Sequence, residues 1–196
     1  GPSNLRYGFD NKIWGTVGYA GYRGPLAEGE GYIRMGIYTM TPEGKDLTFM
    51  HQFNNNTWGM GFMESGEVFG STANNNPAFF GGFPETGYSG DPGMSAKMIA
   101  DTPTFHPITP NVRQVDVFGG YTAGSGYAFA TSGNFPESWR SKVSFLAGPT
   151  GNLLGMYKNI PDGSGYVAKN NFSLIASADE WFSPIMAEVG PDGNLW

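Results

Sequence analysis

The feature that most constrains this chain is a strand–turn–strand pattern, closed by glycine, that occurs twice. In the first copy, two runs rich in aromatic and apolar residues, 58–63 and 67–72, flank the turn Glu64-Ser65-Gly66. Gly66 can supply the positive φ angle that a tight hairpin turn requires. In the second copy, residues 184–189 and 194–196 flank the turn Gly190-Pro191-Asp192-Gly193. A pattern that returns far along the chain predicts a repeated β-unit.

The composition favours a folded all-β protein. Of 196 residues, 31 are Gly and 14 are Pro, while 39% are hydrophobic and 15% are aromatic. This apolar content argues against disorder, and the many Gly and Pro residues suit short strands joined by turns. Charged residues make up 14%, with a net charge of −6 and no basic run, which argues against a nucleic-acid partner. The absence of cysteine excludes disulfides, thiolate zinc sites and Cys-x-x-Cys-His haem attachment within this chain.

The ends of the chain give expectations about its context. No apolar run reaches the roughly 18 residues of a membrane span, and no signal peptide is visible. Gly1-Pro2 fits a protease scar or the start of a fragment, and the chain ends in a strand-like run at Leu195-Trp196. We therefore expect a truncated chain.

The N-terminal part has the spacing of a propeller blade. Residues 11–22, 32–39 and 46–53 are predicted strands, with a polar glycine-rich loop at 21–31, and the hairpin completes a blade-like unit over 11–74. Residues 75–110 hold six of the 14 prolines and little periodicity, which predicts a long loop insertion with at most a helical turn near 95–101.

Regular structure is predicted again from residue 111. A second blade-like unit over 111–177 has strands at 112–117, 127–131, 142–147, 152–158, 166–169 and 174–177, and residues 178–196 begin a further blade. A short helix is predicted at 135–140, with Pro136 in its first turn. We therefore predict one all-β domain over 1–196, built of antiparallel four-stranded blades of a partial β-propeller.

Several motifs in this order resemble a known family. They are Asn55-Asn56-Thr57-Trp58-Gly59, Ser71-Thr72-Ala73-Asn74-Asn75, Arg113-Gln114-Val115-Asp116, Gly120-Tyr121-Thr122-Ala123-Gly124, Pro149-Thr150-Gly151, Asp179-Glu180-Trp181-Phe182 and Ala187-Glu188-Val189-Gly190-Pro191-Asp192-Gly193. From about Leu5 to Trp196, the chain resembles the β-propeller of the membrane-bound dehydrogenase family. These are large bacterial proteins whose propeller, related to the soluble quinoprotein glucose and sorbosone dehydrogenases, often precedes a c-type cytochrome domain.

The resemblance implies oxidation of a sugar or alcohol by hydride transfer to pyrroloquinoline quinone (PQQ), often with Ca²⁺, in the periplasm or outside the cell. Two positions depart from the family pattern: Phe118 stands where a His-Gly-Gly triplet would begin, and Ala147 where a cysteine is expected. Phenylalanine has no titratable nitrogen. The alternative is therefore a non-catalytic module derived from a propeller, which binds glycan or serves as an assembly subunit.

Three residues are the catalytic candidates. Arg113 and Asp116 lie three apart in a strand-like run and so point to opposite faces. Arg113 is either a cation of the site or the partner in a structural ion pair. Of the two histidines, His106 lies in the proline-rich loop and is the candidate base, whereas His51 fits a strand residue whose hydrogen bonds are satisfied.

The substrate candidates are Asp179, Glu180, Trp181, Asn55 and Trp58. A carboxylate pair beside an aromatic ring can grip a sugar or bind a cation; alternatively, Asp179 caps a turn and Trp181 packs between blades. Asn55 can contact sugar hydroxyls or form Asx-turns, and Trp58 can equally belong to the core.

Glu188, in the last repeat, is a weaker candidate as a metal ligand. Half a propeller exposes unpaired sheet faces and strand edges. We therefore expect either self-association or the remainder of a longer polypeptide as its partner.

Overall fold

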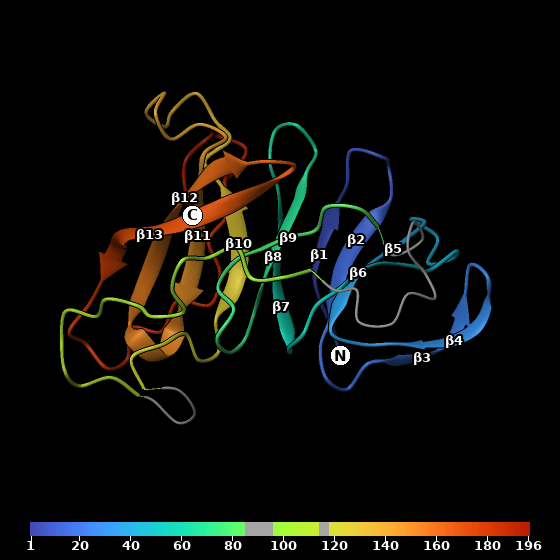
Figure 1. Ribbon diagram of the computed structural model, residues 1–196, viewed down its shortest axis with the longest axis horizontal. Helices are drawn as coiled ribbons and strands as arrows, with labels where there is room; N and C mark the ends of the chain where they lie inside the picture. The colour runs from blue at the N-terminus through green and yellow to red at the C-terminus, as the bar shows by residue number, and fades with distance from the viewer. Residues whose placement is uncertain (85–95, 114–117) are drawn as a thin grey trace.

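The computed structural model describes residues 1–84, 96–113 and 118–196, and within these the chain is almost entirely β (Figure 1). The N-terminal half contains β1 (Pro2–Tyr7), β2 (Ile13–Val17), β3 (Tyr22–Leu26), β4 (Gly29–Ile33), β5 (Gly36–Met40), β6 (Thr48–Gln52), β7 (Thr57–Phe62), β8 (Val68–Thr72) and β9 (Phe79–Phe80). The C-terminal half contains β10 (Ser125–Phe129), β11 (Val143–Gly148), the 3₁₀ helix η2 (Pro149–Gly151), β12 (Leu153–Asp162) and β13 (Gly165–Ala176).

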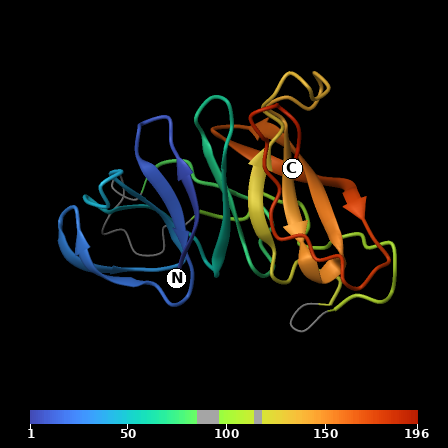
Figure 2. The same cartoon turned by 180° about the vertical axis from the view of Figure 1, so that it is seen from behind.

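Three antiparallel sheets follow one another along the chain, as in a partial propeller. The first has the strand order β1-β2-β5-β6, the second β7-β8-β9 and the third β10-β11-β12-β13. Figures 1 and 2 show them side by side in this order, with the two-stranded β3–β4 ribbon projecting beyond the first sheet. The expected all-β architecture with four-stranded antiparallel sheets is confirmed.

One hairpin turn is built four times with the same backbone bonds. In each copy the first residue donates its N–H to the carbonyl of the fifth residue, and the fourth residue donates its N–H to the carbonyl of the first. The copies run from Gly8 to Lys12, Thr41 to Lys45, Met63 to Glu67 and Gly190 to Asn194. The fourth residue has a positive φ each time: Asn11 60°, Gly44 74°, Gly66 89° and Gly193 79°. Both turns predicted from the sequence are therefore present, together with two further copies, but the last is flanked by an isolated bridge between Val189 and Leu195 rather than by strands.

Glycines let the inner strands of neighbouring sheets touch through their backbones. A Cβ atom on Gly59 would lie 2.3 Å from the carbonyl oxygen of Gly126, and one on Gly61 would lie 2.3 Å from that of Tyr127. Gly59 and Gly61 are two residues apart in β7, so they lie on the same face of the strand, which is the face towards β10. A side chain at either position would push the second and third sheets apart.

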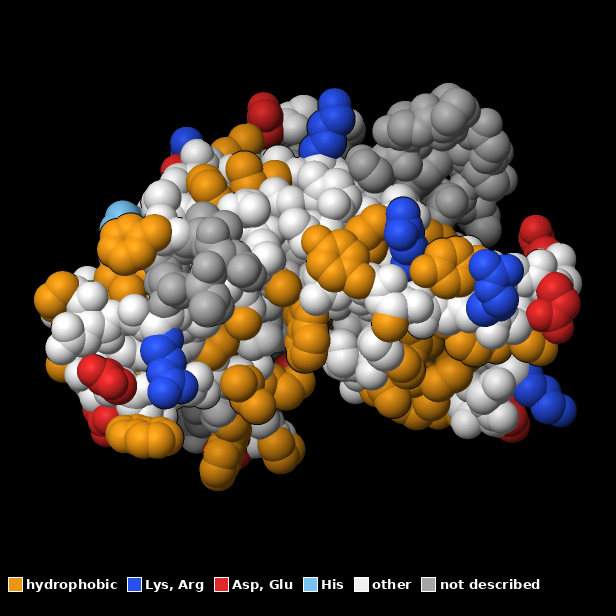
Figure 3. Space-filling model, turned by 90° about the horizontal axis from the view of Figure 1, so that it is seen from below, with side chains coloured by type: hydrophobic (Ala, Val, Ile, Leu, Met, Phe, Trp, Pro, Cys, Tyr) orange, Lys and Arg blue, Asp and Glu red, His pale blue; other side chains and the backbone are white. Residues whose placement is uncertain are grey.

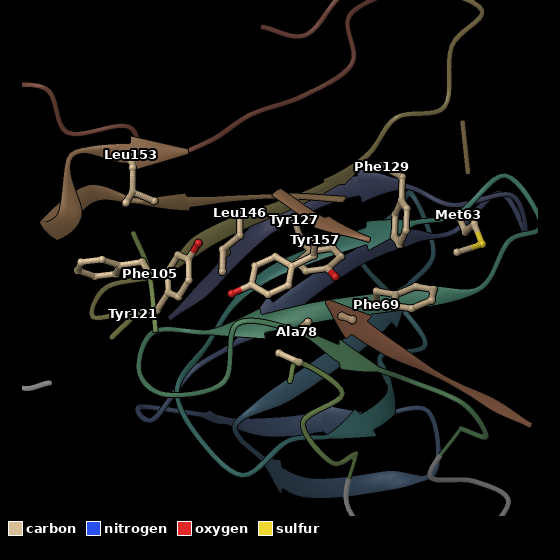
Figure 4. Close-up of a cluster of buried hydrophobic side chains, with 12 residues drawn as sticks. Met63, Phe69, Ala78, Phe105, Tyr121, Tyr127, Phe129, Leu146, Leu153 and Tyr157 are labelled. Atoms are coloured by element: carbon tan, nitrogen blue, oxygen red, sulfur yellow. The ribbon is translucent and has the colours of Figure 1, made fainter. Parts of the chain in front are cut away.

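Aromatic side chains fill the space between the second and third sheets (Figure 4). Phe69 lies at the centre of this cluster, with its ring centroid 4.8 Å from that of Phe129 and 5.1 Å from those of Phe80 and Tyr166. Buried aromatic rings in edge-to-face contact contribute more than their buried area alone. A second cluster around Trp14, Ile37 and Phe53 joins the first and second sheets.

The strands group differently from the predicted blade 11–74. The hairpin of β7 and β8 belongs to a separate sheet with β9, and β1 supplies the fourth strand of the first sheet. The predicted loop at 21–31 is instead the β3–β4 hairpin, which is stabilised by packing on the first sheet. The prediction failed because the glycines and Pro25 interrupt the alternation of apolar and polar residues.

The later elements also differ in detail from the prediction. Residues 166–169 and 174–177 are predicted as separate strands, but β13 runs through both with two irregularities in its pairing. Residues 135–140 form a single turn from Pro136 to Arg140 that does not continue as a helix. The predicted strand 112–117 falls mostly outside the described residues.

Candidate functional site

An ion pair lies where the inner strands of the sheets meet. Arg6 of β1 donates from Nη1 to Oε2 of Glu188 at 2.7 Å and from Nη2 to Oε1 of the same carboxylate. Its Nη2 also donates to the carbonyl oxygen of Tyr127 at 3.2 Å. Arg6, Gly61 and Glu188 each stand two residues before a copy of the repeated turn. Arg6 and Gly61 both lie at the carbonyl of Tyr127, and Glu188 is paired with Arg6. The first, second and third sheets and the last hairpin therefore meet at these residues.

The ion pair with Arg6 affects both the pKa of Glu188 and its ability to bind a metal ion. Burial raises the pKa of its carboxyl group above the ordinary value, and the neighbouring Arg6 guanidinium acts in the opposite direction. Both carboxylate oxygens accept hydrogen bonds from Arg6, so they face a cation rather than an open metal position. No group of three or more His, Cys, Asp or Glu side chains suited to a metal ion occurs within residues 1–84, 96–113 and 118–196.

Loops that flank the strands at one end of the sheets form one hydrogen-bonded face, which we call the loop face. It comprises residues 18–19, 53–57, 73–76, 120–124, 149–152 and 177–183. Hydrogen bonds tie successive loops together: Tyr19 to Asn56, Asn76 to Asn54, Asn75 to Tyr121, Thr150 to Thr122, Ser177 to Asn152 and Ser183 to Pro149. Figure 3 shows the end of the molecule at which β1 begins, with hydrophobic side chains gathered on both sides of an indentation.

Asn55 and Trp58 lie together at one side of the loop face. The Oδ1 atom of Asn55 accepts a hydrogen bond from the hydroxyl group of Tyr19 at 2.5 Å and another from the backbone N–H of Asn56 at 2.6 Å. Asn55 is thus held in a turn, as one of its two interpretations expects. Trp58 is 45% exposed, and its carbonyl accepts a hydrogen bond from the side chain of Asn4.

Asp179, Glu180 and Trp181 lie at the opposite side of the loop face. The carboxylate of Asp179 accepts the backbone N–H of Trp181 at 2.9 Å, which is the turn-capping geometry. Trp181 does not pack between sheets, because 86% of its surface is exposed. Glu180 is exposed beside it. An exposed indole next to an ordered carboxylate is a surface on which a hydroxylated ring can stack.

One of the three catalytic candidates, His106, lies near this side. Its side chain is exposed, and its carbonyl accepts a hydrogen bond from Ser173 of β13 at 3.0 Å. The adjacent Phe105 ring packs on Gly151, which places this segment beside η2. Arg113 is exposed, and Asp116 lies outside the described residues. Glu188 lies apart from these candidates, at the ion pair with Arg6.

His51 is buried within β6, away from the loop face. Its ring stacks on Trp14 at a centroid distance of 6.5 Å, and its Nδ1 atom is buried with no hydrogen-bond partner among the described residues. Burial lowers the pKa of His51 to about 4, although the backbone groups of Phe83 and Gly81 act to raise it. The side chain is therefore neutral near pH 7.

Sequence reasoning missed Arg6, Asn4 and Tyr19. The turn at Gly8 shares with the turn at Gly190 an aspartate at its third position and a tryptophan at its seventh. That match could have identified Arg6 as the counterpart of Glu188. Phe118, which stands where the family resemblance expects histidine, is 88% exposed.

Comparisons with known proteins identify a family and a shared fold. The family model described as "Domain of unknown function (DUF7133)" matches residues 1–196. No curated protein matches the chain. Over the described residues, no helix has the length and apolar character needed to span a membrane.

Solved structures of sugar dehydrogenases are similar in fold. One is a protein from Thermus thermophilus described as an oxidoreductase (glucose dehydrogenase), with TM-score 0.56 and 14% identity over 97% of this chain and 57% of that one. Another is the soluble aldose sugar dehydrogenase from Escherichia coli in its apo form, with TM-score 0.55 and 14% identity over 98% and 58%. A third is the PQQ-bound aldose sugar dehydrogenase from Streptomyces coelicolor, with TM-score 0.48 and 14% identity over 94% and 51%. The chain thus spans between half and three fifths of the length of these proteins.

Proposed function

The chain belongs to the family described as Domain of unknown function (DUF7133), and we propose that it is part of a quinone-dependent dehydrogenase that oxidises a sugar or alcohol on its loop face. The observation that carries the proposal is the gathering of the inner strands at Arg6, Tyr127 and Glu188. The sheet arrangement is shared with sugar dehydrogenases of known structure. We place the protein in the periplasm or outside the cell, and within the wider membrane-bound dehydrogenase family.

The residues of the loop face have separate roles in this proposal. The exposed indole of Trp181 covers the apolar face of the sugar, while Asp179 orders the backbone beneath it. Glu180 and Asn55 contact hydroxyl groups, and Trp58 provides a second ring. His106, whose side chain is exposed, takes the proton of the hydroxyl group that is oxidised.

The described residues differ in how well they fit the two implied cofactors, a quinone and a calcium ion. A quinone, when bound, accepts the hydride from the sugar carbon. The exposed guanidinium of Arg113 would hold its oxygens, whereas Arg6 is already committed to Glu188. The described residues do not fit a calcium site built on carboxylates, because no group of three or more acidic, histidine or cysteine side chains is gathered among them and Glu188 faces Arg6. We therefore derive no role for calcium in this chain.

Reconstitution with PQQ tests the proposal. The protein is mixed with the quinone, with and without Ca²⁺, and reduction of a dye is followed over a panel of aldoses and alcohols. We expect reduction that falls at least tenfold in His106→Gln and Trp181→Ala. Phe9→Ala is the matched control, because Phe9 is 73% exposed in a hairpin turn remote from the loop face. Absence of both dye reduction and a thermal shift with the quinone would contradict the proposal.

A second function has its own support. Phe118 is exposed where the family resemblance expects a histidine, so a non-catalytic module that binds glycan through Trp181 also fits the loop face. Such a module would bind oligosaccharide without the quinone and would reduce no dye. Trp181→Ala would then abolish binding, whereas His106→Gln would leave it unchanged.

A further inference from the structure

A pocket lies between the β3–β4 ribbon and the outer edge of the first sheet. Its volume is about 500 Å³, within the range of roughly 300–1,000 Å³ typical of small-molecule sites. Tyr32 and Ile33 of β4 line one side together with the adjacent Arg34, and Thr48 and Phe49 of β6 line the other together with the adjacent Leu47. Because successive strand residues alternate between faces, this lining shows two strand edges opposite each other. β6 is the outermost strand of its sheet.

Hydrogen bonds close the pocket at both ends. At one end the backbone N–H of Ala27 donates to the carbonyl of Leu47 at 2.8 Å. At the other end the side-chain amide of Gln52 donates to the carbonyls of Arg34 and Met35, each at 3.3 Å. An extended peptide would need a gap open at its ends to run between the strands. The frame therefore favours a compact ligand.

The walls of the pocket are formed before any ligand arrives. Ile33 is buried with Val17 and Tyr38 in a cluster against which Leu26, Leu47 and Phe49 pack. The guanidinium of Arg23 lies 5.0 Å from the centroid of the Tyr32 ring, which helps to position this half-exposed side chain. A pre-formed wall lowers the entropic cost of binding.

The chemistry of the lining favours an uncharged ring that carries hydroxyl groups. The rings of Tyr32 and Phe49 offer apolar surface. Thr48 and Gln52 donate to backbone carbonyls and keep their side-chain oxygens as hydrogen-bond acceptors. Glu28 and Arg34 contribute one charge of each sign, so the lining carries no net charge. A purely apolar ligand would desolvate these polar groups without pairing them. A pyranose has apolar faces and a polar rim, which match both features.

We propose that this pocket, called here the ribbon pocket, is a binding site for one or two neutral sugar units. It lies on the outer edge of the first sheet and shares no lining residue with the loop face. The proposal does not depend on dehydrogenase activity, because the ribbon pocket contains none of the catalytic candidates. Its role is to hold a glycan rather than to transform it.

Ligand-observed NMR tests the proposal with methyl β-D-glucopyranoside and cellobiose, in the absence of quinone. We expect saturation transfer from the protein to the sugar ring protons, and Tyr32→Ala to weaken binding at least tenfold. Tyr7→Ala is the matched control, since Tyr7 is 66% exposed on β1, outside the pocket, and it should bind as the unmodified protein does. Thr48→Val, which keeps the side-chain shape and removes one hydroxyl, should weaken binding severalfold without unfolding the ribbon.

Three outcomes would overturn the proposal. They are the absence of saturation transfer for both sugars at 50 mM, equal transfer in Tyr32→Ala and the unmodified protein, or loss of transfer in Trp181→Ala alone. The last outcome would move the sugar to the loop face and would support the proposed function instead. If the dye assay fails while sugar binding is intact and depends on Tyr32, the ribbon-pocket proposal is supported and the dehydrogenase proposal is contradicted.

Discussion

Arg6 and Glu188 occupy equivalent positions, each two residues before a copy of the same hairpin turn, and their side chains form an ion pair with an Nη1–Oε2 distance of 2.7 Å. The first strand of the chain is thereby joined to its last hairpin. The two side chains retain 19% and 34% of their exposure, so the pair is largely removed from water.

Breaking this pair should destabilise the fold. Arg6→Met leaves the carboxylate of Glu188 without its donors, and we expect the free energy of unfolding to fall by about 2 kcal/mol. Urea denaturation of Arg6→Met, Glu188→Gln and the double variant measures the coupling between the two residues. If the two single effects simply add, the pair contributes nothing as a pair.

The glycines of β7 should not tolerate a side chain. In Gly61→Ala the added methyl group meets the carbonyl oxygen of Tyr127 at 2.3 Å, so we expect a loss of about 1–3 kcal/mol in the free energy of unfolding. Gly133→Ala is the matched control, because a Cβ there has no neighbour within 4 Å. Equal urea midpoints for the two variants would show that the second and third sheets are not in backbone contact at Gly61.

His51 should make stability depend on pH in acid. Its pKa in the folded protein is about 4, whereas the unfolded value is about 6.5, so the unfolded state binds more protons between these values. The contribution of His51 is complete above pH 6.5 and is lost as the pH falls towards 4, by up to about 3 kcal/mol. Chemical denaturation at several pH values should show this slope reduced in His51→Gln. The slope should persist in the control His106→Gln, which changes an exposed histidine; an unchanged slope in His51→Gln would refute the assignment.

The carboxylate in the first turn should hold Trp14 in place. Asp10 accepts hydrogen bonds from the indole Nε1 of Trp14 at 2.9 Å and from the backbone N–H of Lys12 at 3.2 Å. We expect Asp10→Ala to cost about 1 kcal/mol and to alter the tryptophan fluorescence of the folded protein. Glu43→Ala, which removes an exposed carboxylate from a different hairpin turn, is the control. Identical spectra and stabilities for the two variants would contradict this role.

Local sequence signals were sufficient to predict those strands and turns whose own residues favour the conformation they adopt. Gly66 and Gly193 adopt the positive φ angles expected of them, and the strands beside Gly66 were located within a residue or two. The strands predicted beside Gly193 are reduced to an isolated bridge between Val189 and Leu195. The β3–β4 hairpin was not predicted, because Gly24, Pro25 and Gly29 interrupt its alternation. It is stabilised by packing on the first sheet, which no local pattern reports.

The candidate site was predictable only in part. Asn55, Asp179 and Trp181 were recognised as loop residues and do lie on the loop face, whereas Trp58 lies in β7, in the strand predicted for it. The partner of Glu188 was not, because a contact between positions 182 residues apart leaves no mark on the spacing of neighbouring residues. Repetition of the turn at Gly8 was the available signal.

The Arg6–Glu188 contact also bears on how quickly the protein reaches and leaves its native state. Bringing together two groups separated by 182 positions carries a large entropic cost, so we expect their pairing to form late in folding. An interaction that is absent from the transition state acts on the escape rate alone. This one contact therefore prolongs the lifetime of the native state and leaves the rate of folding nearly unchanged.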